Sequence, residues 1–421
     1  MEESKKPALR FKGFHDDWEQ RKLSDVCSEI GDGLHSAPVY DENGKYYFIN
    51  GNNLVNSKII VNETETKRVS EETFKKNNKN LDDTTILLSI NGTIGNLAYY
   101  NDEMVMLGKS AAYLKVMNIE KKFLYTSLQT SNTINSFMSS LTGTTIKNLG
   151  LEAIKKTQIF MPCEKEQTAI GKYFQNLDNL ITLHQRKYES LVNIKKAMLE
   201  KMFPKNEEVV PELRFAGFTD TWEQRKFNVS FDFLQNNALS RAELSNDGEV
   251  MNVHYGDILV KYGEVLDIAQ EELTYLQDSS IMKKYQTSLL RNGDVIIADA
   301  AEDETVGKCS EIAGLSIETV LSGLHTIPCR PAIKFAEGYL GYYMNSDAYH
   351  DQLLPLIQGT KISSISKSAI QDTEIVYPKS EKEQTAISTY FKHLDNLITL
   401  HQRELEKLQN IKKSCLEKMF I

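Results

Sequence analysis

One stretch of forty residues occurs twice in this chain. Residues 164–203 read EKEQTAIGKYFQNLDNLITLHQRKYESLVNIKKAMLEKMF, and residues 381–420 read EKEQTAISTYFKHLDNLITLHQRELEKLQNIKKSCLEKMF. Thirty of the forty positions are identical, at an offset of 217 residues. Because chance does not produce such agreement, the chain contains an internal duplication.

The repeated stretch predicts a long helix with one apolar seam. Its apolar residues recur at alternating steps of four and three, which is the heptad pattern of a coiled coil. The seam positions are Ile170, Phe174, Leu177, Ile181 and His184 in the first copy and Ile387, Phe391, Leu394, Ile398 and His401 in the second. We interpret the two histidines as a polar pair that sets the register of the seam. We expect the two helices to pack against each other and to run antiparallel, because near-identical units meet most readily through a self-complementary contact.

A shorter repeat precedes each insert. Residues 8–22 read ALRFKGFHDDWEQRK and residues 212–226 read ELRFAGFTDTWEQRK, with eleven of fifteen positions identical at an offset of 204. Each unit is therefore a tryptophan motif, an insert and a long helix, and the second insert is 13 residues longer than the first. We expect Trp18 and Trp222 to anchor the repeated frame to the insert.

The two inserts share almost no continuous identity. The few fragments that align include Gly143-Thr-Thr-Ile with Gly359-Thr-Lys-Ile. Short apolar runs bounded by turn residues predict strands, and longer amphipathic runs predict helices. The expected strands include 86–92, 96–100, 256–263 and 294–299, and the expected helices are 123–138 and 336–353.

The fold class that follows is mixed α/β. We expect two α/β domains joined by two long antiparallel coiled-coil helices, with pseudo-twofold symmetry between the units. The expected division is a tryptophan motif (1–22), a first domain (23–162), a central helix (163–204), a linker with the second tryptophan motif (205–226), a second domain (227–378) and a C-terminal helix (379–421).

Composition and charge set limits on the class of protein. With 421 residues, 41% hydrophobic and 25% charged, the chain is typical of folded proteins with two or three domains. Its five cysteines are scattered, which argues against disulfides or a structural zinc site and favours a reducing cytoplasm. No apolar run is long enough to span a membrane. The net charge of −9 alone does not suggest nucleic-acid binding, and the inserts carry −1 (residues 23–160) and −12 (residues 227–377).

Motifs that would indicate catalysis are missing from the sequence. It contains no phosphate-binding loop, H-E-x-x-H zinc motif, G-x-S-x-G nucleophile elbow or [ND]-P-P-[YF] tetrapeptide. Two acidic clusters, Asp82-Asp83 and Glu302-Asp303-Glu304, are interpreted as solvated loop residues rather than a metal site. The chain is therefore not expected to be an enzyme.

The arrangement resembles the specificity subunit of bacterial type I restriction–modification systems, over essentially the whole chain. The resemblance rests on the LRFxGFxDxWEQRK motif, the divergent insert and the EKEQTAI…LDNLITLHQR…LEKMF helix, all present twice. It implies that each insert is a target-recognition domain reading one half of a bipartite, asymmetric DNA site. It also implies that the helices set the spacer and dock two adenine-methyltransferase subunits. S-adenosylmethionine is expected on those partners and no cofactor on this chain, with motor-nuclease restriction subunits in the full complex and a location in the bacterial cytoplasm.

Polar residues in glycine-punctuated loops are the candidates for DNA contact, because such side chains reach phosphates and base edges. The candidates are Asn91, Thr93, Lys109, Ser110, Thr144, Thr145, Lys147 and Asn148 in the first insert and Lys308, His325, Lys361, Ser363 and Ser364 in the second. The lysine pairs 195–196 and 412–413 are interpreted as solvated helix faces.

Two other hypotheses remain open at this point. The acidic second insert favours a coiled-coil scaffold that joins two protein-binding domains without nucleic acid. A third possibility is an enzyme subunit of the related fused systems, with nuclease and methylase in other chains or lost from this one.

Overall fold

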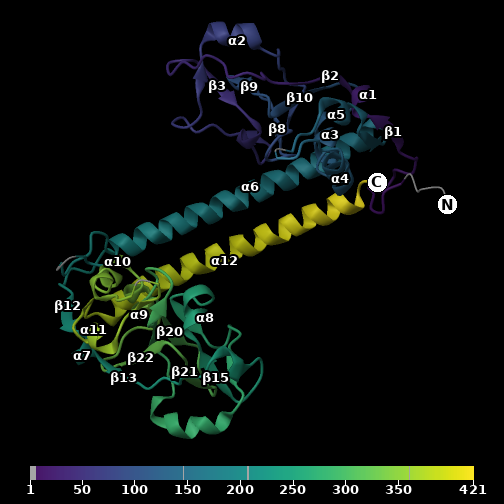
Figure 1. The fold of residues 1–421 in the computed structure, drawn as a ribbon. Coiled ribbons are helices and arrows are strands. Elements are labelled where there is room, and N and C mark those ends of the chain that lie inside the picture. The colour runs from purple at the N-terminus through teal and green to yellow at the C-terminus, as the bar shows by residue number, and fades with distance from the viewer. Residues whose placement is uncertain (1–5, 146, 206–207, 360) are drawn as a thin grey trace. The chain divides into compact units, whose positions relative to one another are not determined.

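The computed structural model describes residues 6–145, 147–205, 208–359 and 361–421. The chain divides into two compact units, Met1–Gln185 with Arg403–Ile421, and Arg186–Gln402. Helices α6 (Glu164–Lys201) and α12 (Glu381–Lys418) are each uninterrupted over 38 residues (Figure 1). Each long helix contributes its two halves to different units, so every unit contains a domain and parts of both helices.

The two long helices run in opposite directions within each unit. In the first unit, Tyr173 of α6 contacts Cys415 of α12, and Asp178, further along α6, pairs with the earlier Lys412. In the second unit, Lys195 of α6 pairs with Asp395 of α12, and Phe203, just after α6, stacks on the earlier Phe391. The predicted antiparallel pair of long helices and the mixed α/β class are confirmed.

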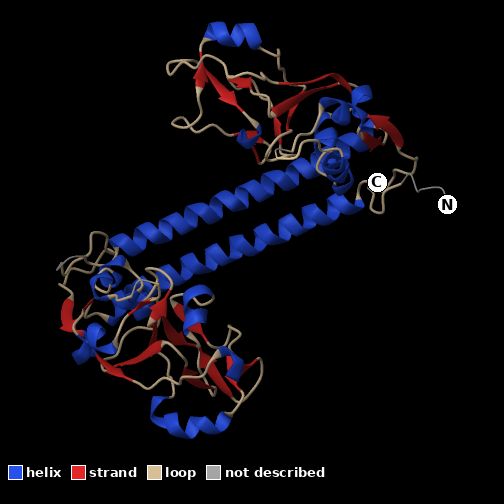
Figure 2. Cartoon of the chain, viewed as in Figure 1, coloured by secondary structure: helices blue, strands red, loops and turns tan. Residues whose placement is uncertain are grey.

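The first unit holds a domain of short strands and short helices (Figure 2). Its strands are β1 (Glu19–Lys22), β2 (Cys27–Asp32), β3 (Tyr46–Ile49), β4 (Leu54–Val55), β5 (Lys58–Ile59), β6 (Arg68–Val69), β7 (Thr85–Ser89), β8 (Leu97–Tyr99), β9 (Val105–Leu107), β10 (Ala111–Val116) and β11 (Gln158–Met161). Its short helices are α1 (Leu23–Val26), the 3-10 turn η1 (Gly51–Asn53), α2 (Glu71–Asn77), α3 (Lys121–Ser127), α4 (Ser131–Ser139) and α5 (Leu151–Lys156).

The central sheet of the first domain has the order β2-β10-β7-β8, with antiparallel neighbours, and a second sheet has the order β6-β3-β9. Strand β7 is fully buried because both of its faces are covered. One face packs with α1, α3 and α5, and the other packs against strands β3 and β9. The two-stranded pair β1–β11 joins the start and the end of the domain.

The second unit repeats this plan with more strands. Its strands are β12 (Glu223–Lys226), β13 (Phe231–Phe233), β14 (Leu244–Ser245), β15 (Val250–Val253), β16 (Val265–Asp267), β17 (Thr274–Leu276), β18 (Val295–Ala298), β19 (Ala300–Ala301), β20 (Cys309–Ala313), β21 (Thr319–Ser322), β22 (Thr326–Pro331), β23 (Ser363–Ser364) and β24 (Glu374–Tyr377). Its short helices are α7 (Phe227–Ser230), α8 (Tyr255–Val260), α9 (Tyr339–Met344), α10 (Asp347–His350) and α11 (Lys367–Gln371), with 3-10 segments η2 (Arg241–Glu243), η3 (Ser279–Ser288) and η4 (Leu354–Leu356).

The sheets of the second domain correspond to those of the first. The order β13-β22-β18-β20-β16 matches β2-β10-β7-β8 with one strand added, β12–β24 matches β1–β11, and β15 pairs parallel with β21 as β3 does with β9. The inserts therefore share a scaffold although their sequences diverge.

The predicted strand at 256–263 is wrong, because this segment contains helix α8. The His254 side chain accepts a hydrogen bond from the backbone N–H of Gly256, which caps the start of the helix. Ile258 is buried whereas Val260 is exposed, and the run is too short for its apolar residues to distinguish a strand from a helix. The strands predicted near residues 86, 96 and 294 are present as β7, β8 and β18.

Each predicted insert helix is two helices. The segment 123–138 breaks between α3 and α4, where the Thr130 side chain caps the new start by accepting from the N–H of Thr133. The segment 336–353 breaks between α9 and α10 at Ser346, whose hydroxyl instead donates to the Tyr343 carbonyl at the end of α9. Hydroxyl residues inside an amphipathic pattern end one helix and start the next because they supply the missing backbone partner.

The tryptophan motifs lock the domains to the long helices. Trp18 and Trp222 are both buried, and they pack against Phe420 and Phe203 respectively. The backbone N–H of Leu9 donates to the Lys418 carbonyl in the first unit. Leu213 and Lys201 make the equivalent bond in the second unit. Each motif therefore packs on the helix end of the other repeat.

Candidate nucleic-acid interface

One edge of the first domain gathers its candidate residues. Strand β7 ends and strand β10 begins at this edge, because Ser89 lies opposite Ala111. The turn after β7 carries Asn91 and Thr93, and the turn before β10 carries Lys109 and Ser110. The sheet topology thus brings together two loops that are separate in the sequence.

The loop at 142–148 joins the same edge. Thr142 and Asn148 exchange two backbone hydrogen bonds of 3.0 and 2.9 Å, which close the loop into a hairpin. Asn148 also bridges to Asn91, and the N–H of Leu149 donates to the Ile90 carbonyl. The candidates Thr144, Thr145 and Lys147 lie in this hairpin and are exposed. All eight candidates of the first insert therefore lie on three loops at one edge.

The second domain has an equivalent edge. The backbone N–H of Asp299 donates to the His325 carbonyl, as that of Ile90 donates to Ser110. The N–H of Ile365 donates to the Asp299 carbonyl, as Leu149 does to Ile90.

The hairpin at 358–364 completes this second edge. Gln358 and Ser364 exchange two backbone bonds, as Thr142 and Asn148 do, and Ser364 lies opposite Ala300. The candidates Lys361, Ser363 and Ser364 lie in this hairpin, and His325 lies beside it. Gly359 has a φ of +110°, and a Cβ there would lie 2.0 Å from the Ile362 carbonyl oxygen. Glycine is therefore required at this turn.

The backbone of Lys308 pairs with Ala298 at this second edge, but its side chain bonds within the domain. Its ammonium donates to the Leu259 carbonyl at 2.9 Å, and the Asn96 amide donates to the Leu54 carbonyl at the equivalent position of the first domain. Burial lowers the pKa of Lys308, although Glu264 opposes this effect. Its ammonium is thus engaged within the domain, unlike the exposed side chain of Lys361.

Sequence reasoning missed Asp299, which shares the second edge with His325. The carboxylate Oδ1 lies 3.2 Å from Nδ1 of His325, and the two side chains are 28% and 50% exposed. Burial raises the pKa of Asp299, while His325 and Lys367 oppose the shift. A carboxylate directly after the apolar run 295–298 was the available signal.

In each lysine pair of the long helices, one lysine is solvated and one is not. The expectation of a solvated face is wrong for Lys195 and Lys412. Lys195 pairs with Glu264 at 2.8 Å and with Asp395 at 2.6 Å, and only 16% of its side chain is exposed. Lys412 pairs with Asp178 at 2.7 Å and donates to Gln129. Each of these lysines therefore bonds both the other long helix, through Asp395 or Asp178, and a domain, through Glu264 or Gln129.

The residues assigned to the helix seam pack on more than the opposite helix. Ile170, Phe174 and Leu177 are buried in a cluster that includes Trp18 and Phe420. Ile387, Phe391 and Leu394 are buried in the core of the second unit. The remaining seam positions, Ile181, His184, Ile398 and His401, are half-buried. The ends of the seam therefore hold the domains and the helices together.

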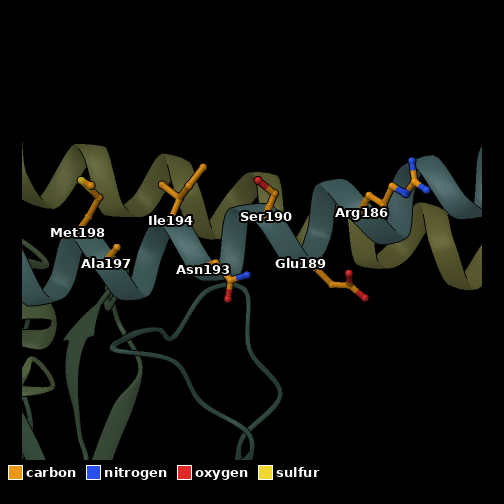
Figure 3. A pocket seen from close by; sticks show the side chains of 7 residues that line it. All are labelled: Arg186, Glu189, Ser190, Asn193, Ile194, Ala197 and Met198. Carbon is orange, nitrogen blue, oxygen red and sulfur yellow. The ribbon is translucent and has the colours of Figure 1, made fainter. Parts of the chain in front are cut away.

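The long helices also present two equivalent exposed faces. One shallow hollow of about 480 Å³ is lined by Arg186, Glu189, Ser190, Asn193, Ile194, Ala197 and Met198 of α6 (Figure 3). Another of about 530 Å³ is lined by Arg403, Glu406, Lys407, Asn410, Ile411 and Ser414 of α12. Apart from Met198, each residue of the first set corresponds to one of the second at the repeat offset of 217. The arginine, glutamate, asparagine and isoleucine are identical in the two sets.

Among the residues that the structure describes, no group of three or more His, Cys, Asp or Glu side chains is placed to hold a metal ion. In the same part of the chain, no helix is both long and apolar enough to cross a membrane.

Comparison with known proteins agrees with this architecture. The family model described as the type I restriction modification DNA specificity domain matches twice, over residues 15–193 and 220–410. The MjaVIII type I restriction enzyme specificity subunit of Methanocaldococcus jannaschii is 24% identical over 96% of this chain and 94% of its own length. The putative MjaX specificity subunit of the same organism is 24% identical over 95% of this chain and 92% of its own.

Solved structures show the same fold. The S subunit of a type I restriction–modification system from M. genitalium superposes with a TM-score of 0.58 and 15% identity, covering 99% of both chains. A chain from a structural study of complex assembly in the type I system has a TM-score of 0.50 and 14% identity, covering 96% of this chain and 97% of that one. This chain therefore belongs to the type I restriction–modification DNA specificity family, and it is a non-catalytic subunit with a role in DNA sequence recognition.

Proposed function

We propose that the chain reads a bipartite, asymmetric DNA site, with one half-site for each domain. The observation that carries this proposal is the pair of equivalent edges, which have the same backbone hydrogen bonds and different side chains. At matched positions the first edge has Ile90 and Ser110, and the second has Asp299 and His325. A shared scaffold with different edge chemistry favours two unlike half-sites, because bases are distinguished by donor and acceptor patterns.

Two copies of one partner subunit dock on the exposed helix faces. The hollows on α6 and α12 repeat the same Arg, Glu, Asn and Ile at an offset of 217, and Ile194 and Ile411 are 40% and 37% exposed. An exposed apolar residue within a polar rim is typical of a protein interface. The partners are adenine-methyltransferase subunits that carry S-adenosylmethionine, and motor-nuclease subunits join the full complex.

The long helices set the spacer between the half-sites. Each has 38 residues, which at 1.5 Å per residue is about 57 Å and exceeds one turn of DNA at roughly 34–36 Å. Uninterrupted helices hold a distance better than loops do, since each residue is fixed by backbone hydrogen bonds.

The partners also supply much of the affinity for DNA. The net charge of −12 on residues 227–377 disfavours phosphate contact by this chain alone. We expect weak, strongly salt-dependent binding by the isolated chain and much tighter binding once the methyltransferase subunit is added.

Gel-shift titration with and without that subunit tests the proposal. The expected result is a specific shift only in the complex. Tight binding by the lone chain at physiological salt would contradict the division of phosphate contacts. A stable complex that binds no DNA would favour the scaffold hypothesis instead.

A further inference from the structure

We propose that Asp299 and His325 form the base-reading pair of the second domain and accept a hydrogen bond from an exocyclic amino group, adenine N6 or cytosine N4. This inference rests on the proposed function and deepens it. It assigns one base position of the second half-site to two named side chains.

The backbone of Asp299 is fixed on both sides. Its N–H donates to the His325 carbonyl at 3.0 Å, and its own carbonyl accepts from the N–H of Ile365 at 2.9 Å. The carboxylate thus emerges at a set place between strand β18 and the hairpin 358–364. A group that reads a base needs such fixed geometry, because a side chain that must first be ordered gives up affinity.

The imidazole of His325 is fixed as well. Its ring packs edge-on against Tyr255 with centroids 5.2 Å apart, and Tyr255 packs on His254 at 4.7 Å. The backbone of His325 has a φ of +53°, which few residue types adopt readily. The turn before β22 thus holds the backbone of His325 in the left-handed region.

The contact between the two side chains determines what they present. An ionised carboxylate can only accept, so Nδ1 of His325 carries the proton in their 3.2 Å contact. In the neutral imidazole Nε2 is then an acceptor. The pair therefore presents acceptor atoms, which match the amino groups that adenine and cytosine display in the major groove.

Charged neighbours are consistent with a local role for the carboxylate. Lys367 lowers the pKa of Asp299, as His325 does, against the effect of burial. Arg241, which lowers the pKa of His254, is itself paired with Asp257 at 2.6 Å. A carboxylate at a DNA-facing edge repels phosphates, so it is expected there only where it receives a hydrogen bond in return.

The first domain offers a different surface at the matched positions. Ile90 replaces the aspartate and is 3% exposed. Ser110 replaces the histidine, and its hydroxyl donates to Asn50 and accepts from the N–H of Gly51. Its hydroxyl is thus occupied within the domain, so the first edge lacks the acceptor pair.

The test uses the full chain in complex with the methyltransferase subunit and a DNA library randomised in both half-sites. Asp299→Asn keeps the shape but replaces one acceptor oxygen by a donor. His325→Asn suits the positive φ and can still contact Asp299, but it removes Nε2. Each variant is expected to lower discrimination at one and the same base pair of the second half-site about tenfold or more, since a good base contact gives roughly 1–3 kcal/mol.

Two control variants separate this outcome from general damage. Lys361→Ala, in the adjacent hairpin, should weaken methylation of all sequences alike and leave discrimination unchanged. Ser110→Ala should leave the second half-site untouched.

Unchanged discrimination at every position in both pair variants would overturn the inference, while continued methylation of a split site would leave the proposed function standing. Uniform loss of methylation by a variant with an unchanged melting temperature would also overturn it, because the pair would then be a general DNA contact.

Discussion

Arg10 makes a two-pronged ion pair with Glu166, its Nε and Nη2 lying 2.6 and 2.7 Å from the two carboxylate oxygens. Arg214 and Glu383 repeat it at 2.6 and 2.8 Å, and both carboxylates are almost fully buried. Each pair joins a tryptophan motif to the first turn of a long helix. Both repeats therefore attach the tryptophan motif to the long helices through a buried ion pair as well as through apolar packing.

Removing one member of this buried ion pair should be costly. We expect Arg214→Leu to lower the free energy of unfolding by about 3–5 kcal/mol, because Glu383 is left buried and unpaired by the arginine. The exposed pair of Lys334 and Glu381 provides the control, and Lys334→Ala should cost less than about 1 kcal/mol. Chemical denaturation measures both. Equal, small losses would show that the buried pair does not attach the motif to the helix.

The half-buried Lys195 and Lys412 should differ in how much they stabilise the fold. Lys195→Met leaves Glu264 and Asp395 close together, whereas Lys412→Met leaves Asp178 alone. We therefore expect the larger loss of stability from Lys195→Met, and a second change, Glu264→Gln, should restore part of it. The exposed neighbour Lys196→Met is the matched control. A Lys195→Met loss no greater than that of Lys412→Met would contradict this explanation.

Glu311 should make the second unit less stable as pH rises. Burial raises the pKa of Glu311 to about 7, although the N–H groups of Gly338 and Gly341 oppose this by donating to it. Against the ordinary pKa of 4.5, the folded chain holds a proton that the unfolded chain loses. Its contribution is full below pH 4.5 and disappears as pH rises to about 7, for a total of about 3 kcal/mol.

Melting curves between pH 4.5 and 8 test this dependence. Glu311→Gln should have a weaker fall of stability with pH than the unchanged chain, since it has no proton to lose. The exposed Glu302→Gln should keep the original slope. Identical slopes in all three proteins would contradict the assignment.

The duplicated helix faces predict a stepwise loss of partners. Ile194→Asp should remove one methyltransferase subunit from the complex, and Ile194→Asp with Ile411→Asp should remove both, because a charge in an apolar contact is not solvated. Val260→Asp, at an 87% exposed position of α8, should change nothing. Native mass measurement gives the stoichiometry. Full occupancy in the double variant would place the partners elsewhere.

The long helices and the tryptophan motifs could be predicted from the sequence because each occurs in two nearly identical copies. The identical seam residues indicated the helices, and the aligned Gly143 and Gly359 marked loops that the structure shows to be equivalent hairpins. Short amphipathic runs were less informative. The 256–263 segment has too few residues to distinguish a strand from a helix. Longer runs are broken at Thr130, which caps α4, and at Ser346, which bonds the last turn of α9.

The edges of the domains were harder to predict than the frame. The polar loops were identified as candidates from the sequence. Only the assembled sheets show that the Lys308 side chain bonds within the domain and that Asp299 lies beside His325. Lys195 is held away from solvent because Glu264 and Asp395 converge on it from distant parts of the sequence. A pattern along the chain does not contain such contacts.

The central claim is that two unlike domains read two unlike half-sites. Mapping adenine methylation in genomic DNA from cells that co-express this chain with its methyltransferase subunit tests it most directly. The expected result is a split motif of two different half-sites at a fixed gap, and replacing residues 227–377 by the insert of a relative should change only one half. Methylation at a continuous or palindromic motif, or none from a complex that assembles, would contradict it.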